Sequence, residues 1–266
     1  MDTAQARKRV RYHCMAVGHI LDMDVLPRLH DLARSANIAL DLELRYASMT
    51  AFSSKASPSV LDFTAMLNDA TTDLAKVRSF LADSQCELLY CVPTDSEVVY
   101  AVRLAGHILD FHTMDALRST VSNEELLIKN VRIEYPVEIK VRERLRSTLC
   151  FQLLASSSQI ENGLDIIRKT AAETGCRVLF MCVNDRERAE PYHLVGAGIV
   201  GGKVMERIST GCEMGNADIC DIHLWPVNPD HEIVRFSIRG DQREVERVKL
   251  EINRIAAEGG LRVGSE

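Results

Sequence analysis

The stretch Gly18-His19-Ile20-Leu21-Asp22 recurs further along the chain as Gly106-His107-Ile108-Leu109-Asp110. An apolar segment precedes both copies and an amphipathic segment follows both, so the flanks also agree in type. Because chance repetition of five chosen residues in so short a chain is improbable, we interpret the two copies as an internal duplication. A fainter third copy, residues 196–201, follows an apolar segment but lacks the His and the Asp.

The hydrophobic period changes in the same order within each repeat, from strand to helix, to two strands, to helix and to strand. In the first repeat we expect strands 10–18, 38–46, 60–67 and 87–92 and helices 24–35 and 72–82. In the second we expect strands 98–106, 126–134, 148–155 and 177–183 and helices 112–120 and 159–174. The third ends with strands 219–227 and 232–239, helix 242–257 and a short strand 261–263.

This order predicts an α+β fold of tandem ferredoxin-like (ACT-like) βαββαβ units, with antiparallel sheets and helices on one face. The expected boundaries are 8–95 for the first unit, 96–184 for the second and 190–266 for a degenerate third. The Ser-rich segment 47–58 is predicted to be a hairpin loop, and the highly charged segment 184–191 an inter-unit linker. Since units this small usually gain stability by pairing sheets, we expect a homo-oligomer formed through sheet edges.

Composition excludes several classes of partner. The chain has 266 residues, of which 46% are hydrophobic, so it can bury real cores. Its formal net charge of −6 provides no basic field for a phosphate backbone, so nucleic acid is not expected as a partner. No apolar run approaches the roughly 18 residues that span a bilayer, and the first residues lack the apolar core of a signal peptide. These features predict a cytoplasmic protein without a membrane partner.

Eight cysteines are scattered singly along the chain, and no Cys-x-x-Cys pair occurs. Because free cysteine behaves as a small hydrophobic residue, we interpret them as reduced thiols of the core. The spacing of Cys212, Cys220, His223 and His231 fits no zinc-finger pattern, so no metal site is predicted.

The motif at 18–22 and 106–110, with the elements that follow it, resembles the conserved region shared by lysine-oxoglutarate reductase/saccharopine dehydrogenase proteins. That region also occurs in archaeal and cyanobacterial proteins of arginine and ornithine metabolism. The resemblance covers residues 17–83 and, less fully, 104–174. It departs from the family at Met23 and Phe111, where a small or polar residue is frequent. The resemblance implies a module that accompanies amino-acid catabolic enzymes, and dehydrogenase activity is not carried over with it.

The motif residues predict a ligand site at the turn between the first strand and the first helix of each unit. A glycine at the strand end lets a ligand approach the backbone closely, and a helix N-terminus attracts carboxylates. An imidazole at this turn can hold the carboxylate of an amino acid or 2-oxo acid, and the Asp can accept from an ammonium group. The candidate ligand-binding residues are Gly18, His19, Asp22, Gly106, His107 and Asp110. The alternative is structural, with each Asp capping its helix and each His fixing the turn.

Two further interpretations remain open. Gly196, Gly198 and Gly201 match the Gly-x-Gly-x-x-Gly fingerprint of dinucleotide-binding proteins, which predicts NAD(P) and an oxidoreductase-related protein as one alternative. Against it, too few residues follow for two mononucleotide-binding halves.

No other cofactor is expected. No catalytic residue is assigned, because neither a nucleophile elbow nor a local Cys-His arrangement on one strand face occurs. A purely structural dimerisation scaffold is the second alternative.

Overall fold

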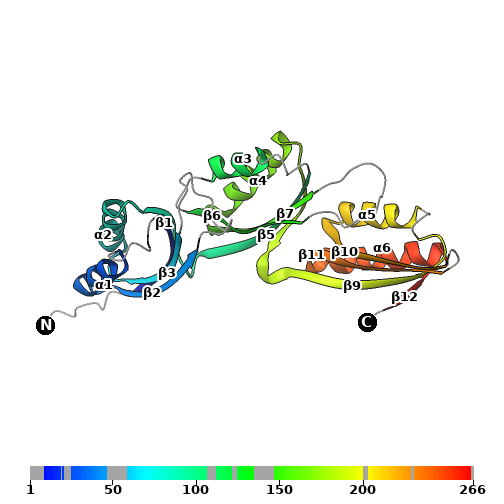
Figure 1. The fold of residues 1–266 in the computed structure, drawn as a ribbon, viewed down its shortest axis with the longest axis horizontal. Helices are drawn as coiled ribbons and strands as arrows, with labels where there is room; N and C mark the ends of the chain where they lie inside the picture. Colours follow the sequence, from blue (N-terminus) through cyan, green and yellow to red (C-terminus); the bar gives the residue numbers. More distant parts are fainter. Residues whose placement is uncertain are drawn as a thin grey trace. The chain divides into compact units, whose positions relative to one another are not determined.

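The computed structural model describes residues 9–18, 20, 25–46, 59–106, 112–121, 125–134, 147–199, 203–228 and 231–264 (Figure 1). Within these ranges it contains three four-stranded sheets, with strand orders β2-β3-β1-β4, β6-β7-β5-β8 and β10-β11-β9-β12. In every sheet the first and third strands of the repeat lie in the middle and the second and fourth lie at the edges. The predicted α+β fold of tandem ferredoxin-like (ACT-like) units is confirmed.

The elements follow the expected order in each repeat. The first contains β1 (Val10–Gly18), α1 (Val25–Ala36), β2 (Ala39–Tyr46), β3 (Ser59–Leu67), α2 (Ala70–Asp83) and β4 (Glu87–Pro93). The second contains β5 (Glu97–Gly106), α3 (His112–Thr120), β6 (Leu126–Glu134), β7 (Ser147–Ser156), α4 (Ile160–Glu173) and β8 (Arg177–Val183). The third contains β9 (Glu187–Gly196), α5 (Val204–Met214), β10 (Ala217–Asn228), β11 (His231–Asp241), α6 (Gln242–Glu258) and β12 (Arg262–Gly264).

Contacts divide the chain into two compact bodies. The N-terminal body lies within residues 1–99, 114–131 and 153–167, and the C-terminal body within 100–113, 132–152 and 168–266. The boundary therefore runs through the second repeat. The three-domain division at 8–95, 96–184 and 190–266 stays a prediction.

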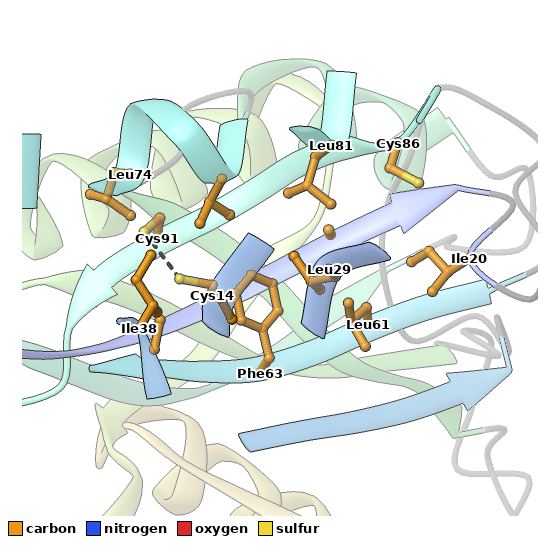
Figure 2. Packing of buried hydrophobic residues seen from close by; sticks show 14 of the residues in the cluster. Cys14, Ile20, Leu29, Ile38, Leu61, Phe63, Leu74, Leu81, Cys86 and Cys91 are labelled. Atoms are coloured by element: carbon orange, nitrogen blue, oxygen red, sulfur yellow. Dashed lines mark hydrogen bonds between the residues drawn. The ribbon is translucent and has the colours of Figure 1, made fainter. Parts of the chain in front are cut away.

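The core of the first repeat lies between its sheet and its two helices (Figure 2). Phe63 and Leu61 project from β3 on the same face because alternate side chains of a strand point to the same side. They pack beneath Leu29 of α1 and Leu81 of α2, each of which belongs to the buried face of its own helix. We term the sheet face away from the helices the open face.

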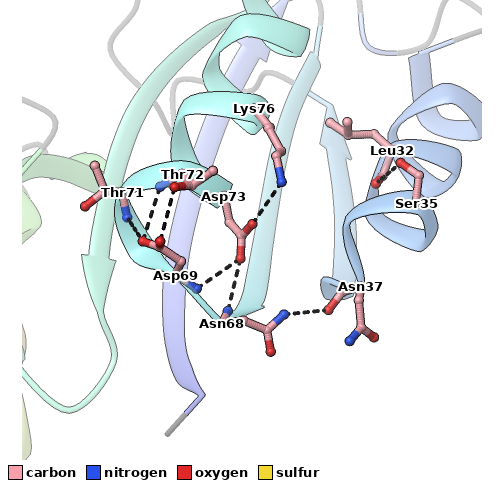
Figure 3. A network of polar contacts seen from close by, with 9 residues as sticks. All are labelled: Leu32, Ser35, Asn37, Asn68, Asp69, Thr71, Thr72, Asp73 and Lys76. Atoms are coloured by element: carbon pink, nitrogen blue, oxygen red, sulfur yellow. Dashed lines mark hydrogen bonds and ion pairs between the residues drawn. The ribbon is translucent and has the colours of Figure 1, made fainter. Parts of the chain in front are cut away.

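The turn into α2 is held by two carboxylates (Figure 3). Asp69 is the N-cap residue, and its side chain accepts from the backbone N–H groups of Thr71 and Thr72. The Asp73 carboxylate accepts from the backbone N–H groups of Asn68 and Asp69, at 3.1 and 3.2 Å. Burial would raise the pKa of Asp73, but these hydrogen bonds outweigh it and lower that pKa. Both carboxylates satisfy donors that a helix start leaves without intrahelical partners.

Four helices, α1, α2, α4 and α6, end in the same way. A residue with positive φ follows the helix, and the next backbone N–H donates over 2.8 Å to the carbonyl five residues back, as in a Schellman ending. The positive-φ residues of this ending are Asn37, Gln85, Gly175 and Gly260. Its donor–acceptor pairs are Ile38 to Ala33, Cys86 to Leu81, Cys176 to Ala171 and Leu261 to Ala256. The ending sets the direction in which the chain leaves each of these helices for the next strand.

The prediction of an inter-unit linker at 184–191 is wrong for most of that segment. A short 3-10 turn occupies Asn184–Arg186, and β9 begins directly at Glu187, whose register partner is Asp241 of β11. Pro191 lies opposite Ser237 of β11 and outside residues 193–195, the only part of β9 that pairs with β12. The charged residues that resemble a linker are strand residues with exposed or half-exposed side chains.

Segment 47–58, predicted to be a hairpin loop, lies outside the described residues. Among the described helices, none has both the length and the apolar composition that crossing a bilayer requires.

Candidate functional site

The motif glycine ends the first strand of every repeat. β1 ends at Gly18, β5 at Gly106 and β9 at Gly196. A Cβ on Gly18 would lie 2.9 Å from the Cα of Cys86, and one on Gly106 would lie 3.1 Å from the Cα of Cys176. Both cysteines directly precede the fourth strand of their repeat. The glycine of the motif is therefore required by the close approach of the backbone that enters the fourth strand.

A buried serine anchors this strand end in the first two repeats. The Ser59 hydroxyl donates to the Gly18 carbonyl over 2.6 Å and accepts from the Ile20 N–H over 3.1 Å. The Ser147 hydroxyl donates to the Gly106 carbonyl over 3.1 Å. In the third repeat the residue opposite Gly196 is Glu232. These serines were missed in the sequence, although a Ser at the start of the third strand in both repeats is a usable signal.

The remaining motif residues, His19, Asp22, His107, Asp110 and Gly201, lie outside the described residues, so their predicted roles stay predictions. The helices that follow the two motifs begin at Val25 and His112. The first turn of α1 contains no acidic side chain, so none of its own carboxylates offsets the positive end of the helix dipole.

A second polar cluster lies on the open face of the first sheet, within the N-terminal body. His13 of β1 is held between two carboxylates, with Nδ1 2.5 Å from Glu97 and Nε2 2.7 Å from Asp62. The Lys129 ammonium lies 3.8 Å from the other oxygen of Asp62. Around the cluster, Met15, Tyr90 and other apolar side chains of this face pack with Leu127 and Leu154.

The environment keeps His13 charged. Burial alone would lower the pKa of His13, but hydrogen bonds to Asp62 and Glu97 and the charges of those carboxylates raise it to about 9. An imidazolium donates from both ring nitrogens, which satisfies both carboxylates at once. Because neither nitrogen is left to take a proton, this geometry suits a structural ion cluster and does not suit a general base.

A third cluster lies on the open face of the second repeat, within the C-terminal body. Arg103 of β5 forms ion pairs with Glu134 and Asp218, and its side chain is 3% exposed. Arg239 lies 3.9 Å from Glu134. Burial raises the pKa of Asp218, and Arg103 only partly offsets that effect. A buried ion pair of this kind requires its partners, because either charge alone would be strongly destabilising.

All eight cysteines are buried, as predicted, and none is bridged. Burial raises the pKa of Cys150, Cys182, Cys212 and Cys220 to about 12, so these thiols are poor nucleophiles at neutral pH. In the described ranges, no three His, Cys, Asp or Glu side chains are grouped as metal ligands would be.

The glycine-rich segment does not lie in the context that its fingerprint presupposes. β9 is antiparallel to both β11 and β12, whereas a dinucleotide-binding fingerprint joins a strand and helix to a parallel sheet. Gly198 has φ +71°, and a Cβ there would meet no atom within 4 Å. NAD(P) binding at this segment gains no support from the topology and stays a prediction.

The open face of the third sheet has a shallow depression, which sequence reasoning missed. Asp221, His223, Arg235 and Ser237 are among the residues that line it. Beside it, the Arg235 guanidinium lies 5.3 Å from the ring centre of Trp225, which is 45% exposed. Asp221 has φ +53° and lies where the β10 register shifts. This shift has no signal in the local sequence.

Comparisons with known proteins give fold-level likenesses. No family model matches the chain, and no curated protein matches it. A solved structure of an unknown protein from Galdieria sulphuraria aligns at 8% identity and TM-score 0.27, covering 64% of this chain and 96% of that one. The regulatory subunit of aspartate kinase from Thermus flavus aligns at 14% identity and TM-score 0.26, covering 61% and 94%. That from Thermus thermophilus, ligand-free, aligns at 13% identity and TM-score 0.23, covering 61% and 92%. With TM-scores this low, the fold assignment depends on the observed strand order and helix placement.

Proposed function

We propose that this chain is a non-catalytic regulatory protein that binds a small amino acid at the strand-to-helix turns of its first two repeats. The observation that supports it most is the anchoring of those turns. Ser59 and Ser147 hold the carbonyls of Gly18 and Gly106, and only these two repeats carry the complete His-Ile-Leu-Asp sequence after the glycine. The third repeat lacks both the serine and the motif.

The proposed chemistry assigns one charged group of the ligand to each motif residue. His19 and His107 bind the ligand carboxylate, with help from the adjacent helix N-terminus. Asp22 and Asp110 accept from its ammonium group. A 2-oxo acid keeps the carboxylate but lacks the ammonium group, so we expect it to bind more weakly than the matching amino acid. The family resemblance of the motif favours lysine, ornithine, arginine and saccharopine as ligands.

Isothermal titration calorimetry with these four compounds and 2-oxoglutarate tests the proposal. We expect the double variant His19→Ala/His107→Ala to bind at least roughly tenfold more weakly, because a charge-assisted hydrogen bond contributes about 1.5–3 kcal/mol. His223→Ala is the matched control, since it removes an exposed imidazole in the third repeat. The proposal is wrong if none of the compounds binds, or if the double variant binds as tightly as the control.

We also infer that the chain self-associates through a sheet edge. β2 is an edge strand of eight residues, whose outer backbone groups can pair with a second copy. Multi-angle light scattering tests this, and a strict monomer at every accessible concentration would contradict it.

A further inference from the structure

Two cysteines of the first repeat lie opposite each other on adjacent strands. Cys14 of β1 is the register partner of Cys91 of β4 in an antiparallel pair. Both side chains project into the core beneath the helices, and their sulfur atoms are 3.1 Å apart (Figure 2). The two thiols therefore share one hydrogen bond in the reduced protein.

We propose that Cys14 and Cys91 are a redox modification site and form a reversible cross-strand disulfide. A disulfide requires Cα atoms about 4.4–6.8 Å apart, and opposed residues of an antiparallel pair are about 4.5–5.5 Å apart. The sulfur atoms must approach by roughly 1 Å to reach a bond length of about 2.05 Å. Since both side chains already lie on the same sheet face, neither strand has to rotate.

Hydrogen peroxide is an oxidant small enough for this buried site. The Cys91 thiolate attacks one peroxide oxygen, the O–O bond breaks, and the departing hydroxide takes a proton to leave as water. The Cys14 sulfur then displaces the hydroxyl of the Cys91 sulfenic acid, the S–O bond breaks, and the Cys14 proton leaves in a second water. Two thiols are oxidised to one disulfide and one peroxide is reduced to two waters.

The surroundings assign the two sulfur atoms different parts in this reaction. Cys91 lies on the edge strand β4 and is 8% exposed, whereas Cys14 lies on a central strand and is fully buried. Peroxide therefore reaches Cys91 first. The hydrogen bond with Cys91 and burial raise the pKa of Cys14, so Cys14 keeps its proton until the sulfenic acid has formed.

The cross-link would join the first and last strands of the first repeat. It closes a loop that contains α1, β2, β3 and α2, which restricts the unfolded chain and leaves the native contacts in place. Oxidation should therefore raise the thermal stability of the first repeat and hold the edge strand in the sheet. This inference does not depend on ligand binding.

Peptide mapping of the whole chain tests the proposal. The reduced native protein is treated with hydrogen peroxide, quenched with acid, alkylated and digested without reductant. We expect a cross-linked peptide pair joining Cys14 to Cys91, lighter by two hydrogen atoms than the two free peptides, and its loss after dithiothreitol. We also expect a higher Tm for the oxidised protein than for the reduced one.

Two variants separate this linkage from general oxidation. Cys14→Ala should abolish the cross-link and the rise in Tm, whereas Cys182→Ala, which removes a buried thiol of the second repeat, should leave both unchanged. The wild-type map decides the matter by itself if Cys14→Ala fails to fold. The proposal is overturned if Cys14 and Cys91 are both recovered alkylated after peroxide, or if the link forms only in urea-unfolded chain.

Discussion

Replacement of His13 by Gln should change how stability depends on pH. In the folded protein the pKa of His13 is about 9, against 6.5 for an ordinary histidine. Because the folded pKa is raised, the stabilisation from His13 is fully present below pH 6.5 and is lost as the pH rises through about 9. A shift of this size is equivalent to roughly 3 kcal/mol. Because the side chain is 12% exposed, solvent weakens the interaction, and we expect His13 to contribute about 1–3 kcal/mol to the free energy of unfolding.

Urea denaturation between pH 6 and pH 10, followed by circular dichroism under reducing conditions, measures this effect. The wild type should be more stable than His13→Gln near pH 6, and the difference should disappear as the pH approaches 10. Comparing the two proteins is necessary because buried thiols also destabilise the folded state at high pH in both. Trp225, the single tryptophan, reports the unfolding of the third repeat by fluorescence and provides an internal reference. Parallel pH profiles for the two proteins would refute the assigned role of His13.

Four other single substitutions and one double variant have expected effects on stability that urea denaturation can measure. Gly18→Ala should lower the free energy of unfolding by about 2–4 kcal/mol, because its Cβ meets the backbone of Cys86 and its φ is +156°. Gly198→Ala should lower it by only about 1 kcal/mol, because its φ is positive but its Cβ meets no atom. Equal losses for the two variants would contradict the packing argument. Ser59→Ala should lose about 1–3 kcal/mol with the two hydrogen bonds of its hydroxyl, and an unchanged urea midpoint would contradict this. Arg103→Ala should lose about 3–5 kcal/mol by leaving Asp218 buried and unpaired, and Arg103→Met with Asp218→Leu should recover most of that loss.

Local sequence was sufficient to predict the elements and their order. Strand and helix periods depend on neighbouring residues, so the expected elements lie close to those observed. The start of β9 was missed because its charged residues are stabilised by pairing with β11, far along the chain. The sequence also gives no indication that the chain turns at Gln85 after α2, because glutamine is not a usual residue at positive φ.

The polar clusters of the open faces could not be predicted from spacing. His13 is separated by 49 residues from Asp62 and by 84 from Glu97, so no short motif contains the cluster. Arg103 and Asp218 come from different repeats. For the predicted ligand site, the sequence identified the strand ends at Gly18 and Gly106, and the structure adds the serines that hold them.

The charged clusters also distinguish the copies of a duplicated module. Three residues before the motif glycine, the first repeat has Met15, the second has Arg103 and the third has His193. Arg103 pairs with Glu134 and Asp218, and a module with methionine at that place would leave the buried Asp218 carboxylate without the guanidinium that pairs with it. Modules that share one architecture therefore cannot exchange places in the chain without burying an unpaired charge. The buried pair of Arg103 and Asp218 therefore makes the contact between the second and third repeats specific to those two repeats.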